Sequence, residues 1–91
     1  MRKMGSYSVR LKRSVEKDLR GLPDSQVPRV LSAMDKLASD LYPRGAIKLS
    51  GAETLYRVRV GDYRIIYEVD TQAREVTIHY LRHRRDAYRG L

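Results

Sequence analysis

The sequence predicts an α+β fold in which an N-terminal strand and an αα-hairpin precede a three-stranded antiparallel meander. Three patterns predict it: apolar residues alternate near the N-terminus, recur every three or four residues over 15–41, and alternate again over 55–81. Because amphipathic helices must bury their apolar stripes, we expect both to pack on one face of an antiparallel sheet. The other face is expected to be open to solvent or to a partner. The 91 residues form one domain, 1–91.

The N-terminal half is predicted to hold one strand and two helices. Tyr7–Lys12 alternates, as is typical of a half-buried strand. Ser14 is expected to cap a short helix over Val15–Leu22, and a second helix is expected to begin at Ser25 and end near Leu41. The apolar stripe of the second helix consists of Val27, Val30, Leu31, Met34, Leu37, Ala38 and Leu41.

The C-terminal half is predicted to form the meander. In chain order it holds a loop or irregular edge over 45–54, strands at Leu55–Val60, Tyr63–Val69 and Glu75–Leu81, and a basic tail over Arg82–Leu91. Gly61 and Asp62 form a two-residue turn of type II′ between the first two of these strands. In the last strand, alternation places Val76, Ile78 and Tyr80 on one face.

The composition favours a polyanionic partner. The net charge is +8 and the pI is about 10.1, which fits binding to nucleic acid, an acidic protein or an anionic membrane surface. A basic surface that serves only solubility is the alternative. No apolar run approaches the ~18–20 residues of a membrane span, and the first residues lack the apolar core of a signal peptide.

Redox and metal chemistry are poorly supported by the sequence. The chain has no cysteine, which excludes disulfides and thiolate zinc sites and fits a cytoplasmic protein. Two histidines are too few for a convincing metal site. No pair of carboxylates accompanies the basic residues of the sheet, since Glu68 is isolated and Asp62 is explained by the turn. We therefore expect no metal and no cofactor.

A cluster of arginines is predicted on the face away from the helices. The two-residue turn sets Arg59 opposite Arg64 and Arg57 opposite Ile66, with Glu68 on the same face. Like charges directly opposite destabilise a sheet, but guanidiniums held on a rigid sheet suit bidentate capture of phosphate or carboxylate. An ordinary solvated face is the alternative interpretation.

The tail RHRRDAYR extends this basic character. Arginines and aromatic residues together can bind backbone phosphates and stack on splayed RNA bases. The alternative is a frayed basic terminus. The candidate residues of the tail are Arg82, His83, Arg84, Arg85, Tyr88 and Arg89.

The stretch IKLSGAETLYRVRVGDYRIIYEV, followed by a turn, a strand and LRHRRDAYR, resembles the RelE/ParE superfamily of bacterial and archaeal toxin–antitoxin pairs, and its RelE branch most. The similarity is strongest over 47–89. The resemblance implies a ribosome-dependent messenger RNA endonuclease that uses the RNA 2′-hydroxyl as nucleophile. By position, Arg64 and Arg84 would stabilise the scissile phosphate, and Tyr88 would transfer a proton or stack on a base.

One departure from the family concerns Arg57 and Arg59, which stand where the best-known members carry lysines. Arginine is effectively always charged, so these residues can stabilise a phosphorane but are poor general bases. The base is then Tyr88, Lys48, a histidine, or none beyond substrate positioning. His79 projects to the arginine face if its two neighbours face the core. The expected reaction needs no metal and gives a 2′,3′-cyclic phosphate and a 5′-hydroxyl.

The resemblance also sets the partners and the alternatives. We expect ribosome and messenger RNA as partners, no membrane, and a cognate antitoxin whose acidic or amphipathic segment covers the basic face. One alternative is the ParE branch, which inhibits DNA gyrase. The other is a basic RNA- or ribosome-binding module without catalysis. RNA phosphates would be bound by Lys48, Arg57, Arg82, His83, Arg85 and Arg89.

Overall fold

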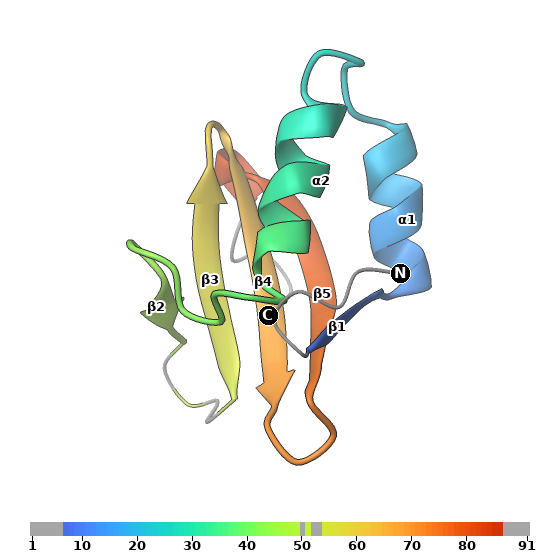
Figure 1. The fold of residues 1–91 in the computed structure, drawn as a ribbon. Helices are drawn as coiled ribbons and strands as arrows, with labels where there is room; N and C mark the ends of the chain where they lie inside the picture. The colour runs from blue at the N-terminus through green and yellow to red at the C-terminus, as the bar shows by residue number, and fades with distance from the viewer. Residues whose placement is uncertain (1–6, 50, 52–53, 87–91) are drawn as a thin grey trace.

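Two helices lie on one face of a five-stranded sheet with the strand order β1-β5-β4-β3-β2 (Figure 1). The computed structural model describes residues 7–49, 51 and 54–86. The predicted α+β fold, with the helical hairpin on one face, is confirmed. The elements are β1 (Ser8–Leu11), α1 (Arg13–Arg20), α2 (Val27–Lys36), β2 (Ile47–Lys48), β3 (Leu55–Val60), β4 (Tyr63–Asp70), β5 (Glu75–His83) and a 3₁₀ turn, η1 (Arg84–Asp86).

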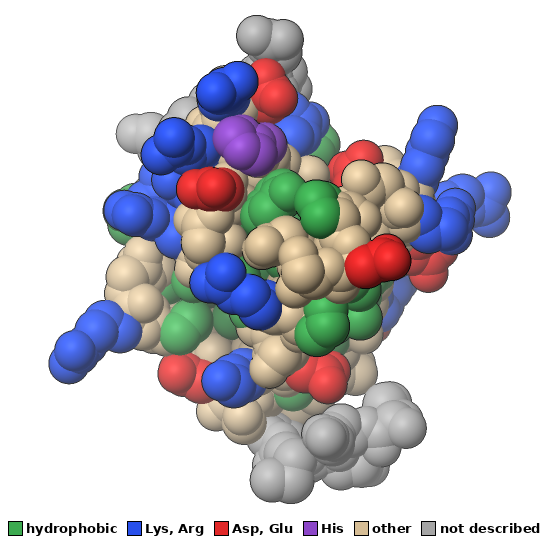
Figure 2. Space-filling view, turned by 90° about the horizontal axis from the view of Figure 1, so that it is seen from above, with side chains coloured by type: hydrophobic (Ala, Val, Ile, Leu, Met, Phe, Trp, Pro, Cys, Tyr) green, Lys and Arg blue, Asp and Glu red, His purple; other side chains and the backbone are tan. Residues whose placement is uncertain are grey.

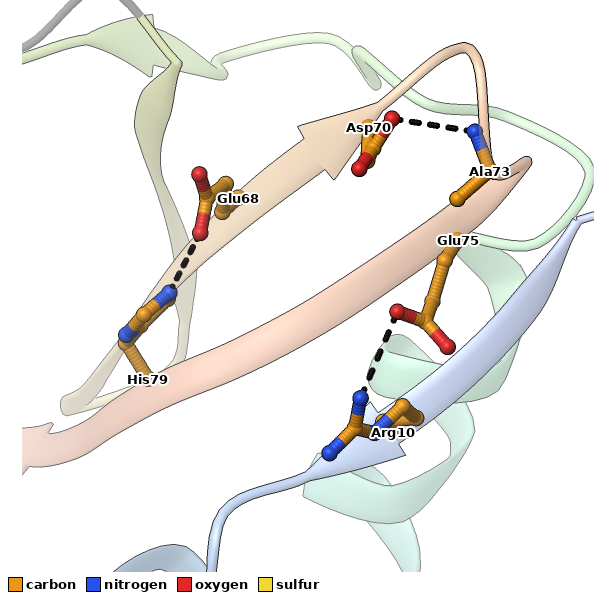
Figure 3. A network of polar contacts seen from close by, with 6 residues as sticks. All are labelled: Arg10, Glu68, Asp70, Ala73, Glu75 and His79. Carbon is orange, nitrogen blue, oxygen red and sulfur yellow. Dashed lines mark hydrogen bonds and ion pairs between the residues drawn. The ribbon is translucent and has the colours of Figure 1, made fainter.

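The sheet is mixed rather than wholly antiparallel. β3, β4 and β5 form the predicted meander, but β1 runs parallel to β5, with Ser8 opposite Glu75. Arg10 on β1 reaches Glu75 on β5 at 3.4 Å (Figure 3). The chain leaves β1 through the helices and starts the meander at the far edge of the sheet. The last meander strand therefore returns beside β1 in the same direction.

The helices are shorter than expected. α1 begins at Arg13 after Lys12, and α2 begins at Val27 after Gln26, so neither Ser14 nor Ser25 is the cap. α2 ends at Lys36, and the chain continues in turns. Leu31 does not join the core, because its side chain is 43% exposed. No helix in the described part of the chain is long and apolar enough to cross a membrane.

The core lies between the helices and the sheet. Its buried members are Val15, Val30, Met34, Leu37, Val58, Ile65, Tyr67, Val69, Val76, Ile78 and Leu81. Tyr67 is fully buried, and its hydroxyl donates a hydrogen bond to the carbonyl oxygen of Leu41 at 2.8 Å. This bond fastens the segment after α2 to the sheet. Burial of the ring raises the pKa of Tyr67 far above its ordinary value.

A β-bulge in β5 changes which side chains face the helices. Ile66 pairs with Tyr80 and Tyr67 pairs with Ile78, so His79 is an extra residue between two paired positions. The alternation shifts by one at this point: Val76 and Ile78 face the helices, and beyond the bulge Leu81 does so. The prediction that Tyr80 shares the face of Ile78 is therefore wrong. Tyr80 and Arg82 lie on the opposite face.

Candidate functional site

Three arginines form a row across the central strands, on the face away from the helices. Arg59 on β3 pairs with Arg64 on β4, as predicted, and Arg64 pairs with Arg82 on β5. Directly paired residues of antiparallel strands share one face, so these three side chains lie side by side. We call them the arginine row. The bulge at His79 is what brings Arg82 into it.

The β3–β4 turn draws Arg64 and Arg84 together. Gly61 has a φ of +59° while Asp62 has no positive φ, which fits the predicted type II′ turn. Arg64 Nη1 donates to the carbonyl oxygens of Gly61 at 3.3 Å and Tyr63 at 3.1 Å. The backbone N–H of Arg84 donates to the carbonyl oxygen of Asp62 at 2.7 Å. Two arginines far apart in sequence thus meet at one turn.

The charge at this end of the sheet is strongly positive. The Asp62 carboxylate lies 4.0 Å from Arg84 Nε, and both side chains are mostly exposed, so the pair is weak. Arg82 lies over the ring of Tyr80 at 4.6 Å and also donates to the carbonyl oxygen of Asp86. Figure 2, which looks down on this end, shows several Lys and Arg side chains near a histidine, with acidic side chains among them. Such a cluster can bind phosphate.

The face that carries the arginine row is not wholly open. Next to the row, Arg57, Ile66 and Tyr80 are paired across the same three strands. Ile66 is 0% exposed although it lies outside the core between helices and sheet. Arg57 is only partly exposed, and its Nε atom is buried. The expectation of an open face is therefore wrong at this position, where an apolar side chain is covered.

His79 lies on the predicted face but is bound to an acid. Its Nε2 lies 2.8 Å from Glu68 Oε1 (Figure 3). Thr54 Oγ1 donates to Glu68 Oε2 at 3.0 Å. The hydrogen bond from His79, and then that from Thr54, lowers the pKa of Glu68. Tyr80, the neighbour of His79 in β5, comes between His79 and Arg82 along the strand.

Several predicted site residues lie away from the arginine row. Lys48 on β2 pairs with Tyr56, whose ring packs against the core, so Lys48 belongs to the helix-bearing face. His83 packs edge-on against Tyr63 at 5.6 Å, and its Nδ1 accepts the backbone N–H of Arg85. Tyr88 and Arg89 lie outside the described residues. Within the described ranges, no three His, Asp or Glu side chains are grouped as metal ligands.

The bulge, and therefore the position of Tyr80, was not predicted from the sequence. The buried residues of β5 are Val76, Ile78 and Leu81. The step from Ile78 to Leu81 is three residues, where a regular strand would step by two. The sequence alone does not show this step, because Tyr80 continues the alternation of Val76 and Ile78.

Comparison with known proteins gives consistent matches. Residues 9–88 match the family model described as "ParE toxin of type II toxin-antitoxin system, parDE". A curated relative from Methanocaldococcus jannaschii, named as a RelE1 toxin, is 29% identical over 87 residues, which cover 92% of this chain and 97% of the relative. The crystal structure of the archaeal RelE–RelB complex from Pyrococcus horikoshii OT3 matches with a TM-score of 0.78 and 37% identity, covering 87% of this chain and 96% of that one. The isolated RelE toxin of E. coli shares the fold, with a TM-score of 0.75 at 17% identity over 93% of this chain and 88% of that one.

Proposed function

Because the chain belongs to the RelE/ParE superfamily of type II toxins, we propose that it is a ribosome-dependent messenger RNA endonuclease. The observation that carries the proposal is the convergence of Arg64 and Arg84 on the β3–β4 turn, beside Arg59. Guanidiniums fixed at one point of a rigid sheet can stabilise the charge that develops on a phosphate under attack.

The proposed reaction is an intramolecular transesterification of RNA. The 2′-oxygen attacks the adjacent phosphorus as a base removes its proton, and the bond from phosphorus to the 5′-oxygen breaks as that oxygen receives a proton. The products are a 2′,3′-cyclic phosphate and a 5′-hydroxyl. Arg64 and Arg84 hold the phosphate oxygens, and Arg59 adds charge stabilisation to the phosphorane. The reaction requires no metal.

We assign the proton transfer to Tyr88, which lies outside the described residues. Arg57 and Arg59 remain charged and cannot accept the proton. Lys48 belongs to the helix-bearing face, and His79 is bound to Glu68 on the far side of Tyr80. A tyrosine can act as a general acid–base group or stack on the base beside the cleaved bond.

The proposal also sets the partners and the location. Ribosome-bound messenger RNA is the substrate, so the protein acts in the cytoplasm. Further RNA and ribosome contacts fall to the tail and its neighbours: Arg57, Arg82, His83, Arg85 and Arg89. Because the Pyrococcus relative was solved with RelB, we propose a cognate antitoxin that covers the arginine row with an acidic or amphipathic segment.

The test is induced expression in growing cells, with 5′-end mapping of messenger RNA. The wild type is compared with Arg64→Ala, Arg84→Ala and Tyr88→Ala. Arg44→Ala is the matched control, because Arg44 is an exposed arginine outside the sheet. We expect growth arrest and cuts inside translated codons for the wild type and the control, and neither for the three site variants. Arrest with intact messages in the wild type would refute the endonuclease.

A second candidate function is inhibition of DNA gyrase. The observation that favours it is the description of the matched family model, which is that of a ParE toxin. A supercoiling assay with purified gyrase separates the two candidates. Inhibition of supercoiling without cleavage of messages would replace the endonuclease proposal. Salt-sensitive RNA binding with neither activity would instead indicate a non-catalytic RNA-binding protein.

A further inference from the structure

A hollow of about 420 Å³ lies between α2 and the end of β3, outside the residues assigned to catalysis except at Arg59. The hollow is lined from α2 by Arg29, Ser32, Ala33 and Lys36, and from the strand and its turn by Arg59, Val60 and Gly61. The four α2 residues follow an i, i+3, i+4, i+7 spacing and therefore form one stripe of the helix. This stripe differs from the core-facing stripe that contains Val30 and Met34.

The hollow carries hydrogen-bond donors and positive charge beside a small apolar part formed by Ala33 and Val60. Three of its lining residues are cationic, Arg29, Lys36 and Arg59, and none is acidic. Ser32 adds a hydroxyl that can donate to an anion. The lining residues therefore supply no negative charge to neutralise these cations. An anion entering the hollow gains charge-assisted hydrogen bonds without displacing a carboxylate.

The hollow and the arginine row meet at the β3–β4 turn. From the helix side, Arg29 reaches the turn: its Nη2 and Nη1 atoms lie 3.2 and 3.3 Å from where a Cβ on Gly61 would stand. From the sheet side, Arg64 donates to the carbonyl oxygen of Gly61. Arg59 belongs to both regions. Arginine side chains therefore flank the β3–β4 turn on both sides, Arg64 from the arginine row and Arg29 from α2.

We propose that the hollow is a second phosphate-binding site, which holds the RNA backbone next to the phosphate bound at Arg64 and Arg84. Its ligands are the side chains of Arg29, Lys36 and Ser32. The choice of RNA as ligand rests on the proposed function, and it is favoured by the position beside the arginine row. This site contributes affinity and direction to the bound strand, whereas chemistry takes place on the other side of the turn.

The test measures binding of a short 2′-O-methyl RNA, which cannot be cleaved, as a function of salt concentration. The double variant Arg29→Gln/Lys36→Gln is compared with Lys17→Gln/Arg20→Gln, which removes the same charge from exposed positions of α1. Removing two phosphate contacts lowers the slope of log K against log salt by about 1.4, at about 0.7 per contact for single strands. We expect that decrease only for the α2 variant. Amide NMR spectra confirm that both variants are folded.

Site-resolved spectra give a second readout. Titration with inorganic phosphate should shift the amide signals of Ser32, Ala33 and Gly61 in the wild type and not in the α2 variant. Equal loss of binding in the α1 and α2 variants would reduce the effect to net charge and overturn the site. Unchanged RNA binding with weakened antitoxin binding in the α2 variant would overturn it in favour of an acidic protein segment. If the wild type binds neither RNA nor phosphate, the second site is overturned, whereas the proposed function is decided separately by the 5′-end mapping in cells.

Discussion

Tyr67→Phe provides a stringent test of how the fold is fastened, because it removes one oxygen atom from a fully buried ring. In the folded protein this oxygen makes a 2.8 Å hydrogen bond to the carbonyl oxygen of Leu41. Loss of a buried hydrogen bond of this kind lowers stability by about 1 kcal/mol. At pH 7 we therefore expect Tyr67→Phe to unfold at a urea concentration about 0.5–1 M lower than the wild type.

The same substitution has the opposite effect at alkaline pH. The pKa of Tyr67 is raised in the folded state, so the hydroxyl stays protonated there, while in the unfolded chain it ionises near pH 10. Stability linked to this group is fully present below pH 10 and is lost as the pH rises further. At pH 11, ionisation of Tyr67 lowers the free energy of the unfolded wild-type chain by about 1.4 kcal/mol, so the folded wild type loses this much stability. The phenylalanine variant has no such loss. The two stability curves should cross at about pH 10.6.

The assay is urea unfolding followed by far-UV circular dichroism at several pH values between 7 and 11. Tyr42→Phe is the control, because Tyr42 is 48% exposed and its hydroxyl interacts with the Tyr56 side chain rather than with a backbone carbonyl. We expect the control to change stability by less than about 0.5 kcal/mol at pH 7. A constant difference between wild type and Tyr67→Phe over this pH range would refute the assignment of a protonated, buried Tyr67.

Three further substitutions test local features. Glu68→Gln should lower stability only above about pH 4. Because the pKa of Glu68 is lowered in the folded state, its carboxylate stabilises the fold above the unfolded pKa, and this stability is lost as the pH falls through the folded pKa. The urea midpoints of the variant and the wild type should therefore converge between pH 6 and pH 3, and a constant gap would contradict the His79 contact. Gly61→Ala should lower the free energy of unfolding by about 1 kcal/mol because φ is +59°, and Gly61→Asn by less; equal losses would argue against backbone strain. Arg10→Ala should change the free energy of unfolding by less than about 0.5 kcal/mol, because its ion pair with Glu75 is solvated. Thermal unfolding measures this change, and a loss above about 1 kcal/mol would show that the pair holds β1 in place.

The sequence carried enough information to place the β3–β4 hairpin residue by residue. Strict alternation and a two-residue turn leave one register, and Arg59 indeed pairs with Arg64. Helix boundaries were less accurate, because Ser14 and Ser25 have the right chemistry for caps while Lys12 and Gln26 occupy the cap positions. Propensity is a weak prior where packing decides the boundary.

The candidate site was predicted in part. Arg59 and Arg64 follow from local pairing, whereas Arg82 depends on a bulge and Arg84 on a contact with a turn that lies 22 residues earlier in the chain. Long-range contacts of this kind leave little trace in local periodicity. The burial of Ile66 was missed for a related reason: alternation gives the face of a side chain but not what covers that face.

The parallel pairing of β1 with β5 has a consequence for the order of folding. Ser8 pairs with Glu75, so the first described strand obtains its only neighbour in the described sheet from the last one. During synthesis the sheet therefore stays incomplete until β5 has left the ribosome, and the contact closes one of the longest loops of the chain. A nascent chain can expose the apolar stripes of α1 and α2 before it can assemble the arginine row, which needs Arg82 from β5. The interval leaves time for a partner to bind the new chain before the row exists.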